Sequence, residues 1–154
     1  MNTASSLTHA QSTSALVPPQ ALAGLKVIEL GQLIAGPFAG KTLADFGAEV
    51  IKIEPPQADG AAGGDPLRQW RMLHNGLSVW WQFQSRNKKS VTLDLRTEEG
   101  RRVVRELIDQ ADVVIENFKP GTLEKWGMGY EALSQTNPGL IMLRISGYGQ
   151  TGPY

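Results

Sequence analysis

The sequence has 154 residues, of which 41% are hydrophobic and 19% charged, a composition typical of a globular protein with a buried core. Its 15 basic residues balance 15 acidic ones, so it lacks the basic excess of most nucleic-acid-binding proteins. The absence of cysteine excludes a disulfide framework, a thiol nucleophile and a cysteine-based metal site. With only two histidines, we expect no metal site.

The amino-terminal residues 1–20 are rich in Ser, Thr and Ala and include Pro18 and Pro19, which predicts a disordered tail. No Lys or Arg precedes Lys26, whereas a secretory or mitochondrial targeting segment needs basic residues. No apolar run approaches the roughly 18 residues of a membrane span. We therefore expect a cytoplasmic protein with no membrane partner and no nucleic-acid partner.

Strands and helices alternate along the rest of the chain. Short apolar runs predict strands at residues 25–30, 48–54, 90–95, 112–116 and 140–146. Helices are expected at residues 37–46, 98–111 and 130–135, with one further helical turn at 123–126. This alternation predicts an α/β fold, a Rossmann-like parallel sheet with flanking helices.

Three details of this prediction bear on the site. Pro37 is expected to be the first residue of its helix, because proline is favoured there. Residues 55–76 are expected to form a long loop, and Ser78–Ser85 fits either a helix or a strand. Thr97 is expected to cap the helix that follows it.

Ligands of such sheets bind where the strands end, and three loops lie there. In residues 147–152, the spacing Gly-x-Gly-x-x-Gly is that of a dinucleotide-binding loop, or of a flexible turn. Gly36-Pro37 could bind an anion at a helix start, or simply begin the helix. Asn117, Phe118 and Lys119 offer hydrogen bonds, a stacking face and a charge, which suits an adenine nucleotide or an ordinary turn. The four tryptophans, Trp126 included, are expected to pack or to lie at interfaces.

Taken together, residues 22–154 resemble the amino-terminal part of the class III CoA-transferases (the CaiB/BaiF family), which include formyl-CoA transferase. The segments that carry the resemblance are L-A-G-L-K-V-I-E-L, A-G-P-F-A-G-K-T-L-A-D-F-G-A-E-V-I-K-I-E-P-P, G-D-P-L-R, R-N-K-K-S-V-T-L-D-L, A-D-V-V-I-E-N-F-K-P-G and L-I-M-L-R-I-S-G-Y-G-Q-T-G-P-Y. Six motifs in one order make the resemblance specific. It implies that residues 21–154 are the amino-terminal part of a larger Rossmann-like domain, and that the glycine-rich end leads into an active site rather than binding a dinucleotide.

The resemblance also implies a chemistry. An aspartate nucleophile would attack an acyl-CoA thioester, carry CoA as an aspartyl-CoA thioester and pass it to a carboxylic acid. Coenzyme A would be a substrate, with no tightly bound cofactor and no metal. The nucleophile would follow residue 154, so no catalytic residue is assigned here, and a chain ending there is expected to be truncated and inactive. The intact protein is expected to be a homodimer.

The positions that match CoA-contacting segments of the family are Leu33, Ile34, Leu93, Asp94, Leu95, Arg96, Asn117, Phe118, Lys119 and Lys125. Pro55 stands where some relatives hold an arginine, and Lys88 or Lys89 is expected to replace that phosphate contact.

Other functions remain open at this point. An α-methylacyl-CoA racemase has a similar amino-terminal third, and E-N-F-K-P-G favours the transferase over it. A module that binds CoA without turnover is a second alternative, and a nicotinamide-dependent oxidoreductase a third. The sequence does not specify the acyl donor or the acceptor acid.

Overall fold

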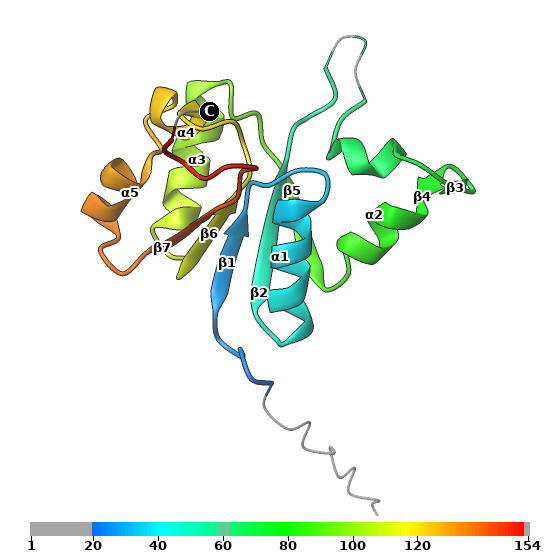
Figure 1. Ribbon diagram of the computed structural model, residues 1–154, viewed down its shortest axis with the longest axis horizontal. Coiled ribbons are helices and arrows are strands. Elements are labelled where there is room, and N and C mark those ends of the chain that lie inside the picture. The colour runs from blue at the N-terminus through cyan, green and yellow to red at the C-terminus, as the bar shows by residue number, and fades with distance from the viewer. Residues whose placement is uncertain (1–19, 59, 61, 153–154) are drawn as a thin grey trace, which may run out of the picture.

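A five-stranded parallel sheet forms the centre of the computed structural model, which describes residues 20–58, 60 and 62–152 (Figure 1). Its strands are β1 (Lys26–Glu29), β2 (Glu49–Glu54), β5 (Lys88–Thr92), β6 (Val113–Glu116) and β7 (Ile141–Arg144). They lie in the order β5-β2-β1-β6-β7, and every neighbouring pair is parallel. The predicted Rossmann-like α/β class is therefore confirmed.

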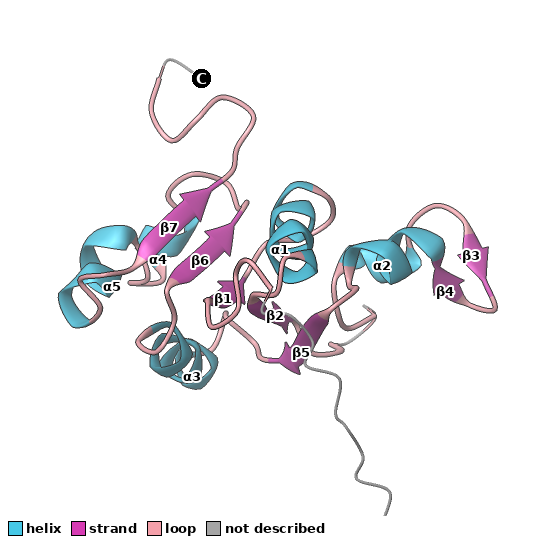
Figure 2. Cartoon of the chain, turned by 90° about the horizontal axis from the view of Figure 1, so that it is seen from below, coloured by secondary structure: helices cyan, strands magenta, loops and turns pink. Residues whose placement is uncertain are grey.

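Helices cover both faces of this sheet, α1 (Ala35–Asp45) on one side and α3 (Glu98–Ile108) on the other (Figure 2). Because successive residues of a strand point to opposite faces, Val27 and Ile28 of β1 belong to two separate cores. Val27 packs in the cluster that contains Ala44 of α1, and Ile28 in the cluster that contains Val104 of α3. The central strands β1 and β6 are buried on both faces, which explains why apolar residues follow one another at 27–28 and 113–115.

The helix boundaries follow the capping signals closely. The Thr97 hydroxyl accepts a hydrogen bond from the Gly100 N–H at 3.0 Å, so Thr97 caps α3 as predicted. Gly47 has a φ of 103°, the left-handed conformation that often follows a helix. The prediction that Pro37 begins its helix was wrong, since α1 begins at Ala35. Pro37 still lies in the first turn, where an N–H has no partner within the helix.

Residues 66–84 form a small arm beside the sheet (Figure 1). It consists of the 3₁₀ helix η1 (Pro66–Gln69), the hairpin strands β3 (Leu73–His74) and β4 (Leu77–Ser78), and helix α2 (Val79–Gln84). The expected long loop is thus partly structured. Residues 78–85, which fitted either a helix or a strand, are mainly helical. The Ser78 hydroxyl caps α2 by accepting from the Trp81 N–H.

Two short helices, α4 (Thr122–Lys125) and α5 (Tyr130–Thr136), connect β6 to β7. The predicted tail lies outside the described residues apart from Gln20, whose carbonyl accepts from the Ala23 N–H at 3.0 Å. Within the described residues, no helix combines the length and apolar character needed to cross a membrane.

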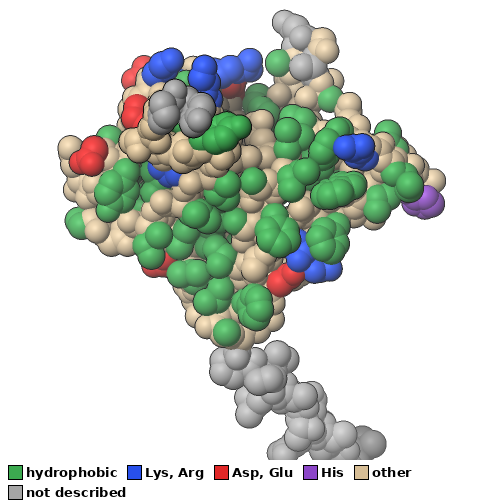
Figure 3. Space-filling view, in the orientation of Figure 1, with side chains coloured by type: hydrophobic (Ala, Val, Ile, Leu, Met, Phe, Trp, Pro, Cys, Tyr) green, Lys and Arg blue, Asp and Glu red, His purple; other side chains and the backbone are tan. Residues whose placement is uncertain are grey.

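Large apolar side chains are exposed on the surface that carries α1 and α2 (Figure 3). Phe38 of α1, Phe46 directly after α1, and Trp80 and Phe83 of α2 are each more than two-fifths exposed. Exposed apolar groups of this size are typical of protein–protein contact surfaces.

Candidate functional site

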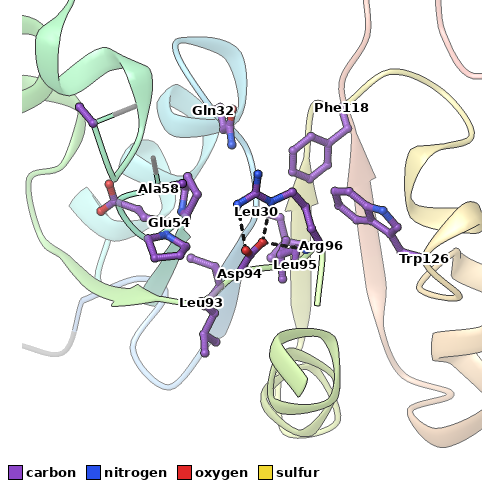
Figure 4. Close-up of a pocket in the computed structure, with 14 residues that line it drawn as sticks. Leu30, Gln32, Glu54, Ala58, Leu93, Asp94, Leu95, Arg96, Phe118 and Trp126 are labelled. Atoms are coloured by element: carbon purple, nitrogen blue, oxygen red, sulfur yellow. Dashed lines mark hydrogen bonds and ion pairs between the residues drawn. The ribbon is translucent and has the colours of Figure 1, made fainter. Parts of the chain in front are cut away.

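The strand order reverses between β1 and β6. The chain continues from β1 into α1 and from β6 into α4. In open α/β sheets, ligands bind in the crevice beyond the carboxyl ends of the strands at such a point. A pocket of about 320 Å³ lies there (Figure 4). Its walls come from the last residues of β2 and from the segments that follow β1, β2, β5 and β6, together with Trp126 directly after α4.

Most of the pocket wall is apolar. Leu30, Ile53 and Leu93 contribute aliphatic surface. Phe118 and Trp126 form an edge-to-face aromatic pair, with ring centroids 5.6 Å apart and planes at 72°. Such a surface suits a flat apolar or aromatic group of a ligand.

An exposed guanidinium lies at the same pocket (Figure 4). The Arg96 side chain is 67% exposed, yet its orientation is fixed by Asp94. Nε and Nη2 of Arg96 each donate to an Asp94 carboxylate oxygen at 2.9 Å. The hydrogen bonds from Arg96 lower the pKa of Asp94, so this acid is ionised at neutral pH. Arg96 thereby presents an oriented cation of the kind that binds phosphate.

Glu54, at the end of β2, is buried at the pocket wall and is held as an anion. Arg68 donates to its carboxylate at 2.7 and 2.8 Å, and Ser90 and the Asp65 N–H donate at 2.5 and 2.7 Å. Burial would raise the pKa of Glu54, but these hydrogen bonds outweigh it and lower the pKa from 4.5 to about 2. Glu54 is therefore a structural anion at neutral pH rather than a proton donor.

The structure brings together five of the ten positions expected to contact a ligand. Those that line the pocket are Leu93, Asp94, Leu95, Arg96 and Phe118. They belong to two loops, because β5 ends at Thr92 and residues 93–95 lie outside the sheet, where a strand was expected.

The other five positions do not line this pocket. Leu33, Ile34, Lys119 and Lys125 are exposed on neighbouring loops and on α4. Asn117 is half-buried, and its side-chain amide pairs with the backbone of Gln32.

Sequence reasoning missed Gln32, Pro55, Pro56 and Trp126 as pocket residues. Trp126 had been assigned to packing, and it does pack on Phe118, but its ring also faces the pocket. Its position directly after Lys125 was the available signal, since α4 follows the loop that contains Phe118.

The expectation that Lys88 or Lys89 serves as a phosphate contact was wrong. Lys88 is the first residue of β5, and its side chain is only 2% exposed. Its Nζ lies 2.6 Å from Glu29 and donates to the Pro37 carbonyl at 2.7 Å. Lys89 pairs with Glu49, the first residue of β2, so it lies near the opposite end of the strands from the pocket.

The glycine-rich segment after β7 forms bends within the described residues, with Gly149 and Gly152 at φ values of 85° and 137°. The Ser146 hydroxyl donates to the Gly149 carbonyl at 2.6 Å. The helix that a dinucleotide-binding loop must precede is not found among the residues described after β7, up to residue 152.

The fold and the pocket together define an α/β protein of the Rossmann-like type, with a ligand-sized crevice at its topological switch point. The model of CoA-transferase family III matches residues 22–154, and the chain belongs to this family.

Individual members of this family are similar to the chain in sequence and in structure. A succinyl-CoA–D-citramalate CoA-transferase of Chloroflexus aurantiacus is 56% identical over 138 residues, which cover 89% of this chain and 33% of that protein. The alpha subunit of a succinyl-CoA–L-malate CoA-transferase from Chloroflexus aurantiacus is 50% identical, over 86% of this chain and 30% of its own length. The crystal structure of a CaiB/BaiF family protein from Brucella suis superposes with a TM-score of 0.79 and 48% identity, over 88% of this chain and 36% of that one. The chain thus spans about a third of the length of the relatives it matches.

Proposed function

We propose that this chain forms the CoA-binding, amino-terminal part of an acyl-CoA transferase, in which residues 21–154 belong to a larger domain. The observation that carries the proposal is the pocket at the switch point, which combines the Phe118–Trp126 pair with the oriented guanidinium of Arg96. Membership of CoA-transferase family III supports it independently.

Each part of coenzyme A has a complementary group on this chain. The adenine ring would stack against Phe118 and Trp126, since bases stack on aromatic side chains at a gain of roughly 1–3 kcal/mol. Arg96 would pair with a phosphate, and the exposed Lys119 and Lys125 would add positive charge nearby. Leu33 and Ile34, exposed on the loop after β1, would contact the acyl or pantetheine part.

The proposed reaction uses an aspartate nucleophile that lies beyond residue 154. Its carboxylate attacks the thioester carbonyl and expels CoA thiolate, which leaves an acyl–aspartyl anhydride. The thiolate then attacks the aspartyl carbonyl and releases the donor carboxylate, which leaves an aspartyl-CoA thioester. The acceptor carboxylate attacks the aspartyl-CoA carbonyl and expels CoA thiolate, which leaves a second anhydride. The thiolate then attacks the acceptor carbonyl of this anhydride, which releases the acceptor as its CoA thioester and regenerates the aspartate. No oxidant, reductant or metal enters this balance.

The names of the two Chloroflexus relatives suggest the substrates. Both relatives are named for succinyl-CoA, with D-citramalate or L-malate as its counterpart. We propose succinyl-CoA as the donor and a small dicarboxylic acid as the acceptor.

The direct test is a transfer assay on the protein that contains this chain. Succinyl-CoA is mixed with a panel of carboxylic acids, and the CoA thioesters formed are identified by mass spectrometry. Formation of a new thioester with release of succinate supports the transferase. Exchange of the α-proton of a methylacyl-CoA with solvent, without transfer, would instead establish the racemase alternative.

We further propose that the protein assembles as a homodimer, which the exposed apolar side chains of α1 and α2 support. Sedimentation velocity of the same protein tests this, since a monomer at micromolar concentration would contradict it.

A further inference from the structure

Four charged side chains are buried together beneath α1, outside the pocket. Glu29 and Lys52 come from β1 and β2, Asp65 from the segment before η1, and Lys88 from β5, and each side chain is at most 2% exposed. Lys52 Nζ lies 2.9 Å from Glu29 and 2.8 Å from Asp65, while Lys88 pairs with the other oxygen of Glu29. The cluster holds two positive and two negative groups, so its charges balance.

This cluster is connected to the pocket through the loop after β1. Lys52 Nζ donates to the Gly31 carbonyl at 2.6 Å. Two residues further on, the Leu33 N–H donates to the Asp65 carboxylate at 3.0 and 3.2 Å. Gln32 lies between these two anchored backbone groups and lines the pocket.

The anchored loop has a conformation that its own residues disfavour. Leu33 has a φ of 61°, in the left-handed region that residues other than glycine seldom occupy. A strained residue persists only where surrounding contacts fix it. Lys52 and Asp65 supply such contacts, to the residues directly before and after Gln32.

Stability alone does not account for the buried charges. An apolar pair of similar volume is often at least as stabilising as a buried ion pair. Apolar side chains, however, offer neither a donor to the Gly31 carbonyl nor an acceptor to the Leu33 N–H.

We propose that Lys52 and Asp65 are positioning residues, which hold residues 31–33 in the conformation that places Gln32 at the pocket and so set its affinity for coenzyme A. This role rests on the proposed function. Neither side chain touches the ligand, and both act through the backbone of the loop.

The test compares two double substitutions in the protein that contains this chain. Lys52→Met with Asp65→Asn removes one positive and one negative charge and leaves Glu29 paired with Lys88. Lys41→Met with Asp45→Asn is the matched control, since it removes a Lys–Asp pair, 2.6 Å apart, within α1. Asp65→Asn alone, which keeps Lys52 and its bond to the Gly31 carbonyl, is the milder variant should the first pair not fold.

Two readouts are needed, calorimetric titration with free coenzyme A and amide hydrogen exchange at Leu33. For the first pair, we expect a dissociation constant raised about tenfold and Leu33 exchange accelerated at least about tenfold, with the amides of β1 and β6 unaffected. Asp65→Asn alone should give a smaller change in the same direction, and the control pair should match wild type.

The outcomes separate the two proposals. Wild type that fails to bind coenzyme A would overturn the proposed function, and this role with it. Wild type that binds, beside a folded first-pair variant that binds equally well, would overturn the positioning role alone.

Discussion

The side-chain amide of Asn117 pairs with the backbone of Gln32 in both directions. Asn117 Oδ1 accepts from the Gln32 N–H at 2.7 Å, and Nδ2 donates to the Gln32 carbonyl at 2.9 Å. These two bonds join the loop after β1 to the loop after β6, across the point where the strand order reverses. Gln32 is therefore fixed from one side by Asn117, while its neighbours Gly31 and Leu33 are fixed by Lys52 and Asp65.

Replacing Asn117 with alanine should destabilise the chain. The substitution removes the partners of two backbone groups, and an unsatisfied buried polar group costs about 1–3 kcal/mol. We expect the free energy of unfolding to fall by about 2 kcal/mol in urea denaturation followed by tryptophan fluorescence. The exposed amide of Gln135 provides the control, and Gln135→Ala should stay within about 0.5 kcal/mol of wild type. Equal stability of the two variants would contradict this role for Asn117.

Gly40→Ala should destabilise α1 although alanine is the better helix former. A methyl group at this position would overlap the carboxylate of Glu29, which is buried and paired with Lys52 and Lys88. Alanine gains about 1 kcal/mol of helix propensity, but overpacking costs more, so we expect a net loss of about 1–3 kcal/mol in thermal unfolding. Gly147→Ala meets no atom within 4 Å and should be nearly neutral. A Gly40→Ala variant more stable than wild type would show that α1 does not pack so closely on Glu29.

Glu54 should make stability depend on pH in the acid range. Its pKa falls from 4.5 to about 2 on folding, so its stabilising contribution is complete above pH 4.5 and is lost as the pH drops toward 2. Glu54→Gln should therefore be less stable than wild type at pH 7, with the difference shrinking by an amount on the order of 2 kcal/mol between pH 4.5 and 2. Urea denaturation at a series of pH values measures this, with the exposed Glu131→Gln as control. A difference independent of pH would mean that Glu54 is not held as an anion.

The parts of the fold that could be predicted are those governed by local chemistry. Val27 and Ile28 lie in a short apolar run that reads as a strand buried on both faces, and Thr97 is a strong helix cap whatever surrounds it. The predicted strand began at residue 90, whereas β5 begins two residues earlier, at Lys88. Lys88 was therefore expected outside the sheet, as a phosphate contact. A lysine beside a second lysine suggests a solvent-exposed position, but Lys88 is paired within the sheet, so its side chain points to the α1 face and meets Glu29.

The candidate site was predictable only through the resemblance and only in part. Residues 93–96 and Phe118 are distant in sequence, and they meet because β5 and β6 end at the same edge of the sheet. The contribution of Trp126, the left-handed conformation of Leu33 and the link from Lys52 to Gly31 all arise from tertiary contacts. No spacing in the sequence encodes them, so the structure was needed to find them.

Arg96 offers the sharpest single-residue test of ligand binding. Its side chain is 67% exposed and pairs with Asp94, so Arg96→Ala should change stability by less than about 0.5 kcal/mol. Loss of a charge-assisted phosphate contact should nevertheless raise the dissociation constant for coenzyme A about tenfold. Arg86→Ala is the matched control, because Arg86 is also an exposed arginine paired with an aspartate, Asp45, but does not line the pocket.

The most direct measurement is the calorimetric titration of coenzyme A into the wild-type, Arg96→Ala and Arg86→Ala forms of the protein that contains this chain. The proposed function predicts saturable binding to wild type and to Arg86→Ala with the same affinity, and clearly weaker binding to Arg96→Ala. Absence of binding to a folded wild-type chain, or equal affinity of all three, would contradict the assignment of this pocket to coenzyme A.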